Sequence, residues 1–346
     1  MSSLRRYADS GMVSDTLLSV ENLTTVFDVK PRPIVAVNDV SFEIRKGETL
    51  GLVGESGSGK SVTAFSIIGL LQSPGRVAGG RVMFQGRDLA QLPEPEMRKV
   101  RGAGIGFVFQ EPMAALNPVM RVGAHIAEAL VVHGMASKTA ARDQAIELLR
   151  AVKITDPEKR VDDYPHQLSG GMRQRVMMAV ALACKPPLLI ADEPTTALDV
   201  TVQAQVLELL RDMKKQFDLS LLLITHDLGV IAETADRVAV MYAGRIVEQG
   251  TVREIFHQPK HPYTRGLLAS IPGGAAGSRL QAIDGTVPNL ASLPPGCSFA
   301  PRCGDRMEVC ATAFPDVSNI GPEHTTRCHL YSAQAPSLKP QAERVP

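Results

Sequence analysis

The hydrophobic and polar positions of the chain alternate in patterns typical of strands. Two N-terminal segments, 17–27 and 36–44, alternate apolar and polar residues with a period of two, as half-buried strands do. Four later segments are short and almost continuously apolar, which is typical of strands buried on both faces of a parallel sheet. These segments are 49–54, 104–110, 187–193 and 219–226.

Segments with the apolar spacing of helices lie between these predicted strands. Three segments have apolar residues three and four positions apart, namely 60–71, 200–217 and 227–235. The stretch 114–182 also has helical periodicity, and 237–250 is typical of a hairpin that turns at Ala243-Gly244. Strands that alternate with helices predict an α/β fold around a mainly parallel sheet, with an inserted helical subdomain at about 111–183.

The composition and the periodicity of the sequence change after about residue 257. Proline and glycine become frequent, the periodicity fades, and four of the five cysteines occur there. We therefore expect a flexible leader at 1–14, a main domain at 15–257 and a separate C-terminal region at 258–346.

Composition and charge restrict the class of protein. Hydrophobic residues make up 44% of the 346 residues, enough for a normal globular core, and the net charge is +1. Because this charge creates no field that would recruit nucleic acid, we expect no nucleic-acid partner. No signal peptide and no apolar run of about 18 residues is evident, which predicts a cytoplasmic protein.

A glycine-rich loop follows the apolar strand 49–54 and precedes a predicted helix. Its residues match the P-loop pattern G-x-x-x-x-G-K-[ST], in which backbone N–H groups surround phosphate oxygens. The lysine reaches the β- and γ-phosphates and the serine hydroxyl binds Mg²⁺. The predicted ATP and Mg²⁺ site comprises Gly54, Glu55, Ser56, Gly57, Ser58, Gly59, Lys60 and Ser61, followed by the backbone N–H of Val62.

Two carboxylates end the apolar strand 188–193. Asp192 is expected to hold Mg²⁺, directly or through water. Glu193 follows it and is expected to polarise the attacking water as a general base.

The segment QLSGGMRQR (167–175) resembles the LSGGQ signature of ABC-transporter ATPases, with Met172 where glutamine is usual. A serine and glycines before a helix form a second phosphate-binding site. The resemblance implies that Ser169, Gly170 and Gly171 bind the nucleotide of a second ATPase subunit in a head-to-tail dimer.

The other motifs of this family occur in the family's order. Gln110 resembles the Q-loop glutamine, which senses Mg²⁺, and Asp199 resembles the D-loop residue that faces the opposite site. His226 resembles the switch histidine, which contacts the γ-phosphate and orients the water.

The family also stacks adenine on an aromatic residue upstream of the P-loop. Phe27 is the candidate, and Ile34 or Val35 are alternatives because the intervening segment is long.

Two further segments, 111–130 and the HPYT-containing 258–272, resemble the ATPases of bacterial dipeptide, oligopeptide and nickel importers. The resemblance implies ATP hydrolysis that drives peptide import at the cytoplasmic face of the cell membrane. Its implied partners are two membrane permeases, a second ATPase subunit and, indirectly, an external peptide-binding protein. A nickel or other small-solute importer, and a soluble non-transport ABC ATPase, are the alternatives. A homodimer and a heterodimer both fit the sequence, and the subgroup favours the heterodimer.

The four C-terminal cysteines have the spacing C-x5-C-x6-C-x17-C, without the close pairs of structural zinc sites. An iron–sulfur cluster accepts four cysteines at variable spacing, and the importer resemblance also implies a [4Fe–4S] cluster. Zinc binding and free or disulfide-bonded thiols are alternatives, with His324 and His329 as nearby ligands. The predicted ligands are Cys297, Cys303, Cys310 and Cys328.

Overall fold

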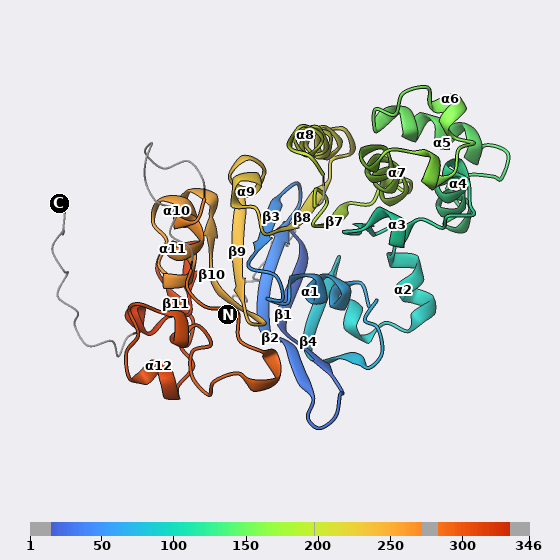
Figure 1. Cartoon of the computed structure of the whole chain (residues 1–346). Helices are drawn as coiled ribbons and strands as arrows, with labels where there is room; N and C mark the ends of the chain where they lie inside the picture. The colour runs from blue at the N-terminus through green and yellow to red at the C-terminus, as the bar shows by residue number, and fades with distance from the viewer. Residues whose placement is uncertain (1–14, 197, 272–282, 333–346) are drawn as a thin grey trace, which may run out of the picture.

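The computed structural model describes residues 15–196, 198–271 and 283–332, so the predicted leader at 1–14 lies outside it. An eight-stranded sheet forms the centre, with a second, four-stranded sheet beside it (Figure 1). The helical segment between residues 112 and 182 and the C-terminal segment lie at opposite ends of the main sheet. The predicted α/β class is confirmed.

The main sheet has the order β11-β12-β10-β9-β3-β8-β7-β6. Its five strands from β9 to β6 are parallel, as the sequence predicts, whereas β10, β12 and β11 continue it in antiparallel pairing. The strands are β3 (Thr49–Val53), β6 (Ile105–Val108), β7 (Leu188–Asp192), β8 (Ser220–Thr225), β9 (Arg237–Tyr242), β10 (Arg245–Thr251), β11 (Ser318–Asn319) and β12 (Thr325–Thr326).

The second sheet is entirely antiparallel, in the order β2-β1-β4-β5. The sequence pattern predicts two of its strands but not β4, in which glycines interrupt the apolar residues. Its strands are β1 (Thr16–Phe27), β2 (Ile34–Arg45), β4 (Gly75–Phe84) and β5 (Arg87–Asp88).

The helices of the described residues cover both faces of the main sheet and form the inserted subdomain. The stretch with helical periodicity, 114–182, contains α4 to α7, and the long amphipathic segment 200–217 is one helix. The helices are α1 (Lys60–Ile67), α2 (Glu94–Val100), α3 (Pro112–Ala115), α4 (Val122–Val132), α5 (Ala141–Ala151), α6 (Pro157–Arg160), α7 (Gly170–Leu182), α8 (Val200–Phe217), α9 (Leu228–Thr234), α10 (Val252–His257), α11 (Pro262–Ala269) and α12 (Val309–Thr312).

The apolar parallel strands supply two hydrophobic cores. In β8, Leu222 and Ile224 face the core between the two sheets, whereas Leu221 and Leu223 face the core beneath α7 and α8. Because successive side chains of a strand point to opposite faces, a strand buried on both faces needs a continuous apolar run. This packing fixes the ends of β3, β7 and β8, from which the site is built.

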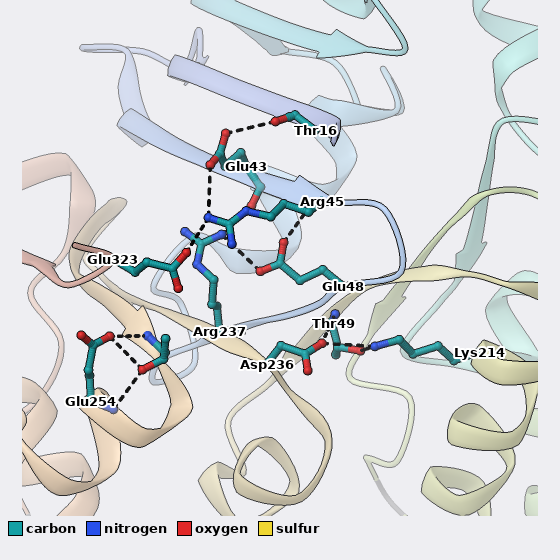
Figure 2. Close-up of polar contacts among 11 residues, drawn as sticks. Thr16, Glu43, Arg45, Glu48, Thr49, Lys214, Asp236, Arg237, Glu254 and Glu323 are labelled. Carbon is teal, nitrogen blue, oxygen red and sulfur yellow. Dashed lines mark hydrogen bonds and ion pairs between the residues drawn. The ribbon is translucent and has the colours of Figure 1, made fainter. Parts of the chain in front are cut away.

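The C-terminal segment packs closely on the main sheet. The buried carboxylate of Glu248 in β10 accepts hydrogen bonds from the backbone N–H of Lys260 and His261 at 2.7 and 2.9 Å, and lies 2.7 Å from Nε2 of His324. Figure 2 shows a second connection, an ion pair of 2.5 Å between Arg45 and Glu323. These contacts join residues on the two sides of the predicted domain boundary near residue 257. The division into two domains therefore remains a prediction.

A buried ion pair lies beside this connection. Arg237 contacts the carboxylate of Glu48 at 3.2 Å, and both side chains are almost fully buried (Figure 2).

None of the helices in the described part of the chain has the length and apolar character that a membrane span requires.

Candidate active site

A cavity of about 1020 Å³ lies where the parallel strands β3, β7 and β8 end. The glycine-rich loop at 54–62 lines it together with Gln110, Glu193 and His226. The structure therefore brings the P-loop and the three predicted catalytic residues to one cavity.

The glycines of this loop occupy positions that other residues do not fit. Gly54 has a φ of +156°, and a Cβ atom there would lie 2.2 Å from the carbonyl oxygen of Met241. Gly59 has a φ of +103° and precedes α1, and a Cβ atom there would lie 2.7 Å from the carbonyl oxygen of Ala36. The loop can therefore follow the neighbouring backbone closely, with the N–H groups of the first turn of α1 available to phosphate.

Lys60 is the cation of this loop. Its Nζ donates to the carbonyl oxygens of Gly54 and Glu55 at 2.8 and 3.0 Å. Burial lowers the pKa of Lys60, an effect that the carboxylates of Glu193 and Asp192 oppose. A desolvated ammonium group beside exposed backbone N–H groups is suited to bind the phosphates of a nucleotide.

A hydroxyl and a carboxylate meet beside Lys60. Ser61 Oγ donates to Oδ1 of Asp192 at 3.0 Å, and Asp192 is 2% exposed at the end of β7. Burial raises the pKa of Asp192 to about 6. These two oxygen groups are the kind that Mg²⁺ binds, so the pair fits the predicted magnesium site.

Glu193 lies at the centre of the predicted catalytic residues. Its Oε2 accepts hydrogen bonds from Nε2 of Gln110 at 3.1 Å and from Oγ1 of Thr196 at 2.8 Å. Its Oε1 lies 3.4 Å from Nδ1 of His226. The carboxylate is thus held in place by neighbours on both sides. Sequence reasoning missed Thr196, although its position three residues after Glu193 in a turn indicates such a contact.

The signature residues line a different cavity of about 430 Å³. Ser169 caps α7 by accepting a hydrogen bond from the N–H of Met172 at 3.3 Å, and Gly170 and Gly171 follow it. Asp199 lines the same cavity and caps α8. No P-loop residue lines this second cavity. Within one chain, the two sets of predicted phosphate-binding residues are therefore separate.

Comparisons with known proteins agree with this geometry. Residues 37–196 match the ABC transporter family, and residues 247–310 match the family described as oligopeptide/dipeptide transporter, C-terminal region. The dipeptide transport ATP-binding protein DppD of Bacillus subtilis is 52% identical over 323 residues, covering 93% of this chain and 96% of the relative. The oligopeptide transport ATP-binding protein OppD of Escherichia coli is 52% identical over 303 residues, covering 87% and 90%.

The chain belongs to the ABC transporter ATPase family. Its fold is similar to a dimeric structure of the ATP-binding cassette MJ0796 bound to ADP and Pi, with a TM-score of 0.62 and 29% identity. That similarity covers 68% of this chain and 99% of the solved chain. The protein is therefore an ATP-binding and ATP-hydrolysing enzyme, and the resemblance to the ATPases of peptide importers is confirmed.

The predicted adenine-stacking residue of this ABC ATPase lies away from the cavity lining. Phe27 ends β1, and its ring lies near Gly75. Ala36 lines the cavity, whereas Phe27 and its alternatives Ile34 and Val35 do not. The stacking role of Phe27 remains a prediction. Residues of the C-terminal segment line this part of the cavity, and no sequence motif marks them.

The predicted [4Fe–4S] cluster is wrong. The described residues contain no group of three or more His, Cys, Asp or Glu side chains that could hold a metal ion, and the relatives are named only as ATP-binding proteins. The four cysteines do line one cavity, but its volume is about 10 Å³, which is roughly the space of one water molecule. The cysteines are Cys297, Cys303, Cys310 and Cys328.

Burial also changes the pKa of two of these thiols. It raises the pKa of Cys303 to about 11 and that of Cys328 to about 12. All of the cysteines are free; Cys310 and Cys328 are buried, whereas Cys297 and Cys303 are partly buried. The four pack as small apolar side chains.

Proposed function

We propose that this ABC ATPase drives the import of dipeptides or oligopeptides across the cytoplasmic membrane. The observation that carries the proposal is the 52% identity to a dipeptide transport ATP-binding protein over 93% of the chain. The match of residues 247–310 to the oligopeptide/dipeptide transporter C-terminal region supports it. We propose the division into an ATPase domain at 15–257 and a C-terminal region at 258–346 on the same basis.

We propose that the catalytic steps use the residues of the larger cavity. Lys60 and the backbone N–H groups of the loop bind the β- and γ-phosphates. Ser61 and Asp192, together with Gln110, would hold Mg²⁺, and the ion would neutralise phosphate charge. Glu193 accepts a proton from the attacking water. The contacts of its carboxylate with Gln110, Thr196 and His226 support this role, because they fix its direction.

We propose that His226 contacts the γ-phosphate and orients the water. Its side chain is 59% exposed at the end of β8, so it can reach a ligand in the cavity.

We propose that two ATPase subunits enclose two nucleotides, with the signature residues of one over the P-loop of the other. The separation of the two cavities within one chain supports this arrangement, because each half-site needs its complement from another subunit. The dimeric structures of the similar cassette MJ0796 support it as well. The second subunit is either a copy of this chain or a homologous ATPase.

The remaining partners follow from the proposed import function. We propose that the subunits lie at the cytoplasmic face of the membrane and bind two permease subunits. An external peptide-binding protein delivers the substrate. ATP favours the closed dimer over the open one, and hydrolysis reverses this preference.

Uptake measurements in cells that lack this chain test the proposal. We expect the loss of labelled dipeptide uptake but normal nickel uptake. Wild-type protein should restore dipeptide uptake, whereas the Glu193→Gln variant should not. Loss of nickel uptake with normal dipeptide uptake would contradict peptide import and favour the related nickel transporters.

A further inference from the structure

The C-terminal segment reaches the nucleotide cavity. Its residues Gly285, Thr286, Val287 and Leu290 line the cavity together with the P-loop. Val287 and Leu290 are half-buried and apolar. The short helix η3 (Leu290–Ser292) lies against β2, the strand that contains Ala36. A segment about 230 positions from the P-loop in sequence therefore forms one wall of its cavity.

The sheet order shows which part of the nucleotide this wall faces. Gln110, Glu193 and His226 follow β6, β7 and β8, which all lie on one side of β3 in the sheet. The P-loop follows β3 itself. The γ-phosphate reacts on the side of the cavity that carries these three residues. The ribose and base of the nucleotide therefore extend from the P-loop toward the opposite side.

The opposite side of β3 is occupied by β9 and the turn that follows it. The N–H of Gly244 in this turn donates to the carbonyl oxygen of Ser58, and the N–H of Asn38 donates to the carbonyl oxygen of Gly244, both at 2.8 Å. Ala36 lies beside this turn, because its carbonyl oxygen lies 2.8 Å from the position of a Cβ atom at Gly244. Ala36 and the wall at 285–290 therefore bound the space that remains for the base.

One buried guanidinium group connects this wall to the P-loop. Arg302 donates from Nη1 and Nη2 to the two carboxylate oxygens of Glu55 at 2.7 and 3.0 Å. Its Nε donates to the carbonyl oxygen of Asp284 at 2.9 Å, and Nη2 donates to that of Ile283 at 3.2 Å. The side chain of Arg302 is only 5% exposed. Arg302 therefore holds a P-loop side chain and the backbone directly before Gly285 at the same time.

A neighbouring tyrosine strengthens this connection. The N–H of Glu55 donates to the hydroxyl oxygen of Tyr263 in α11 at 2.9 Å. The C-terminal segment thus contacts both the side chain and the backbone of the second P-loop residue. A bidentate arrangement with four acceptors requires arginine, since the ammonium group of lysine has only three N–H donors and lacks the planar fork of a guanidinium group.

We propose that residues 285–290 form the base-side wall of the nucleotide site and that Arg302 is the positioning residue that fixes this wall to the P-loop. The wall offers apolar contact from Val287 and Leu290 to a nucleobase. The proposal rests on triphosphate binding by the P-loop, as proposed above.

The test compares two probes on the full chain by calorimetry, each with Mg²⁺. ATP has a base, whereas inorganic tripolyphosphate has only the phosphates. Truncation of the wall in Val287→Ala/Leu290→Ala should weaken ATP binding roughly a hundredfold, since each of the two lost apolar contacts should weaken it about tenfold. Tripolyphosphate binding should not change. Leu293→Ala is the matched control, because Leu293 packs on the same core but does not line the cavity.

Several outcomes would contradict the proposal that residues 285–290 form a wall of the nucleotide site. Unchanged ATP binding, or equal weakening of both probes, would contradict it. If the double variant unfolds, Val287→Thr keeps the side-chain shape and should weaken ATP alone. If the wild-type chain binds neither probe, triphosphate binding by the P-loop itself is contradicted. If only the proposed wall is wrong, the wild-type chain still binds both probes. This result differs from the one that contradicts triphosphate binding by the P-loop.

The role of Arg302 is tested by steady-state kinetics of ATP hydrolysis. Arg302→Gln should raise KM for ATP roughly tenfold with a much smaller change in kcat, as expected when a ligand is bound less well but reacts normally. Arg302→Lys should give an intermediate KM. Arg265→Gln is the control, since Arg265 forms an exposed ion pair with Asp305 in the same segment. An unchanged KM, or an equal loss of kcat in Arg302→Gln, would overturn the positioning role.

Discussion

Replacement of Asp192 by asparagine should stabilise the protein while it abolishes magnesium-dependent activity. The carboxylate is 2% exposed, and the amide oxygen of an asparagine at this position can still accept the hydrogen bond from Ser61. Burial raises the pKa of Asp192 from 3.8 to about 6. The free protein therefore holds a charged group at neutral pH in a place that disfavours the charge.

The magnitude follows from this pKa. One pKa unit corresponds to about 1.4 kcal/mol, so the difference between 3.8 and about 6 lowers the free energy of unfolding by about 3 kcal/mol at neutral pH. Below pH about 4 the carboxyl group is protonated in both the folded and the unfolded state, and this destabilisation vanishes. Between pH about 4 and 6 the unfolded state ionises first, so the wild type loses stability as the pH rises. Above pH about 6 the loss is constant.

Urea unfolding without Mg²⁺ or nucleotide measures this effect. At pH 8, Asp192→Asn should be more stable than the wild type by up to about 3 kcal/mol, and the gain should decrease as the pH falls from about 6 toward 4. The exposed carboxylate of Asp218 provides the control, because Asp218→Asn removes a charge without burial. ATP hydrolysis by Asp192→Asn should fall at least about a hundredfold. A folded variant that is less stable than the wild type at pH 8 would refute the reasoning.

Two further substitutions test the scaffold of the site. Gly54→Ala would place a Cβ atom 2.2 Å from the carbonyl oxygen of Met241, so we expect the loss of ATP binding in calorimetry; normal affinity would show that the loop does not need glycine there. Glu248→Leu leaves three hydrogen-bonding groups without their partner, those of His261 and His324 buried and that of Lys260 partly buried, so the free energy of unfolding should fall by about 3 kcal/mol or more in urea. A change within about 0.5 kcal/mol would contradict the role of Glu248 in holding the C-terminal segment.

Much of the fold follows from local patterns in the sequence. The apolar runs of β3, β7 and β8 predict strands buried on both faces, and the residues at their ends supply the P-loop, Asp192 and Glu193. The antiparallel sheet is less evident. Its strand β4 contains glycines at positions 75, 79 and 80, which weaken the period-two pattern. Strands β11 and β12 have two residues each, too few for any periodicity.

The part of the site that the sequence does not predict consists of long-range contacts. Arg302 and Glu55 are 247 positions apart, and neither spacing nor composition indicates that they form an ion pair. The cysteines show the opposite problem. Their spacing fits a metal cluster, but spacing does not report the small volume of the cavity between the side chains. Both features depend on how the C-terminal segment packs on the sheet.

The central claim is that two half-sites from separate subunits enclose ATP, with Glu193 as the base. Light scattering of the Glu193→Gln variant tests it most directly. Without hydrolysis, ATP with Mg²⁺ should convert the monomer to a dimer, whereas ADP should not. An added Ser169→Arg substitution should prevent the dimer without preventing ATP binding. A variant that binds ATP but remains monomeric both alone and when mixed with a homologous ATPase subunit, or a dimer that Ser169→Arg does not affect, would contradict the account.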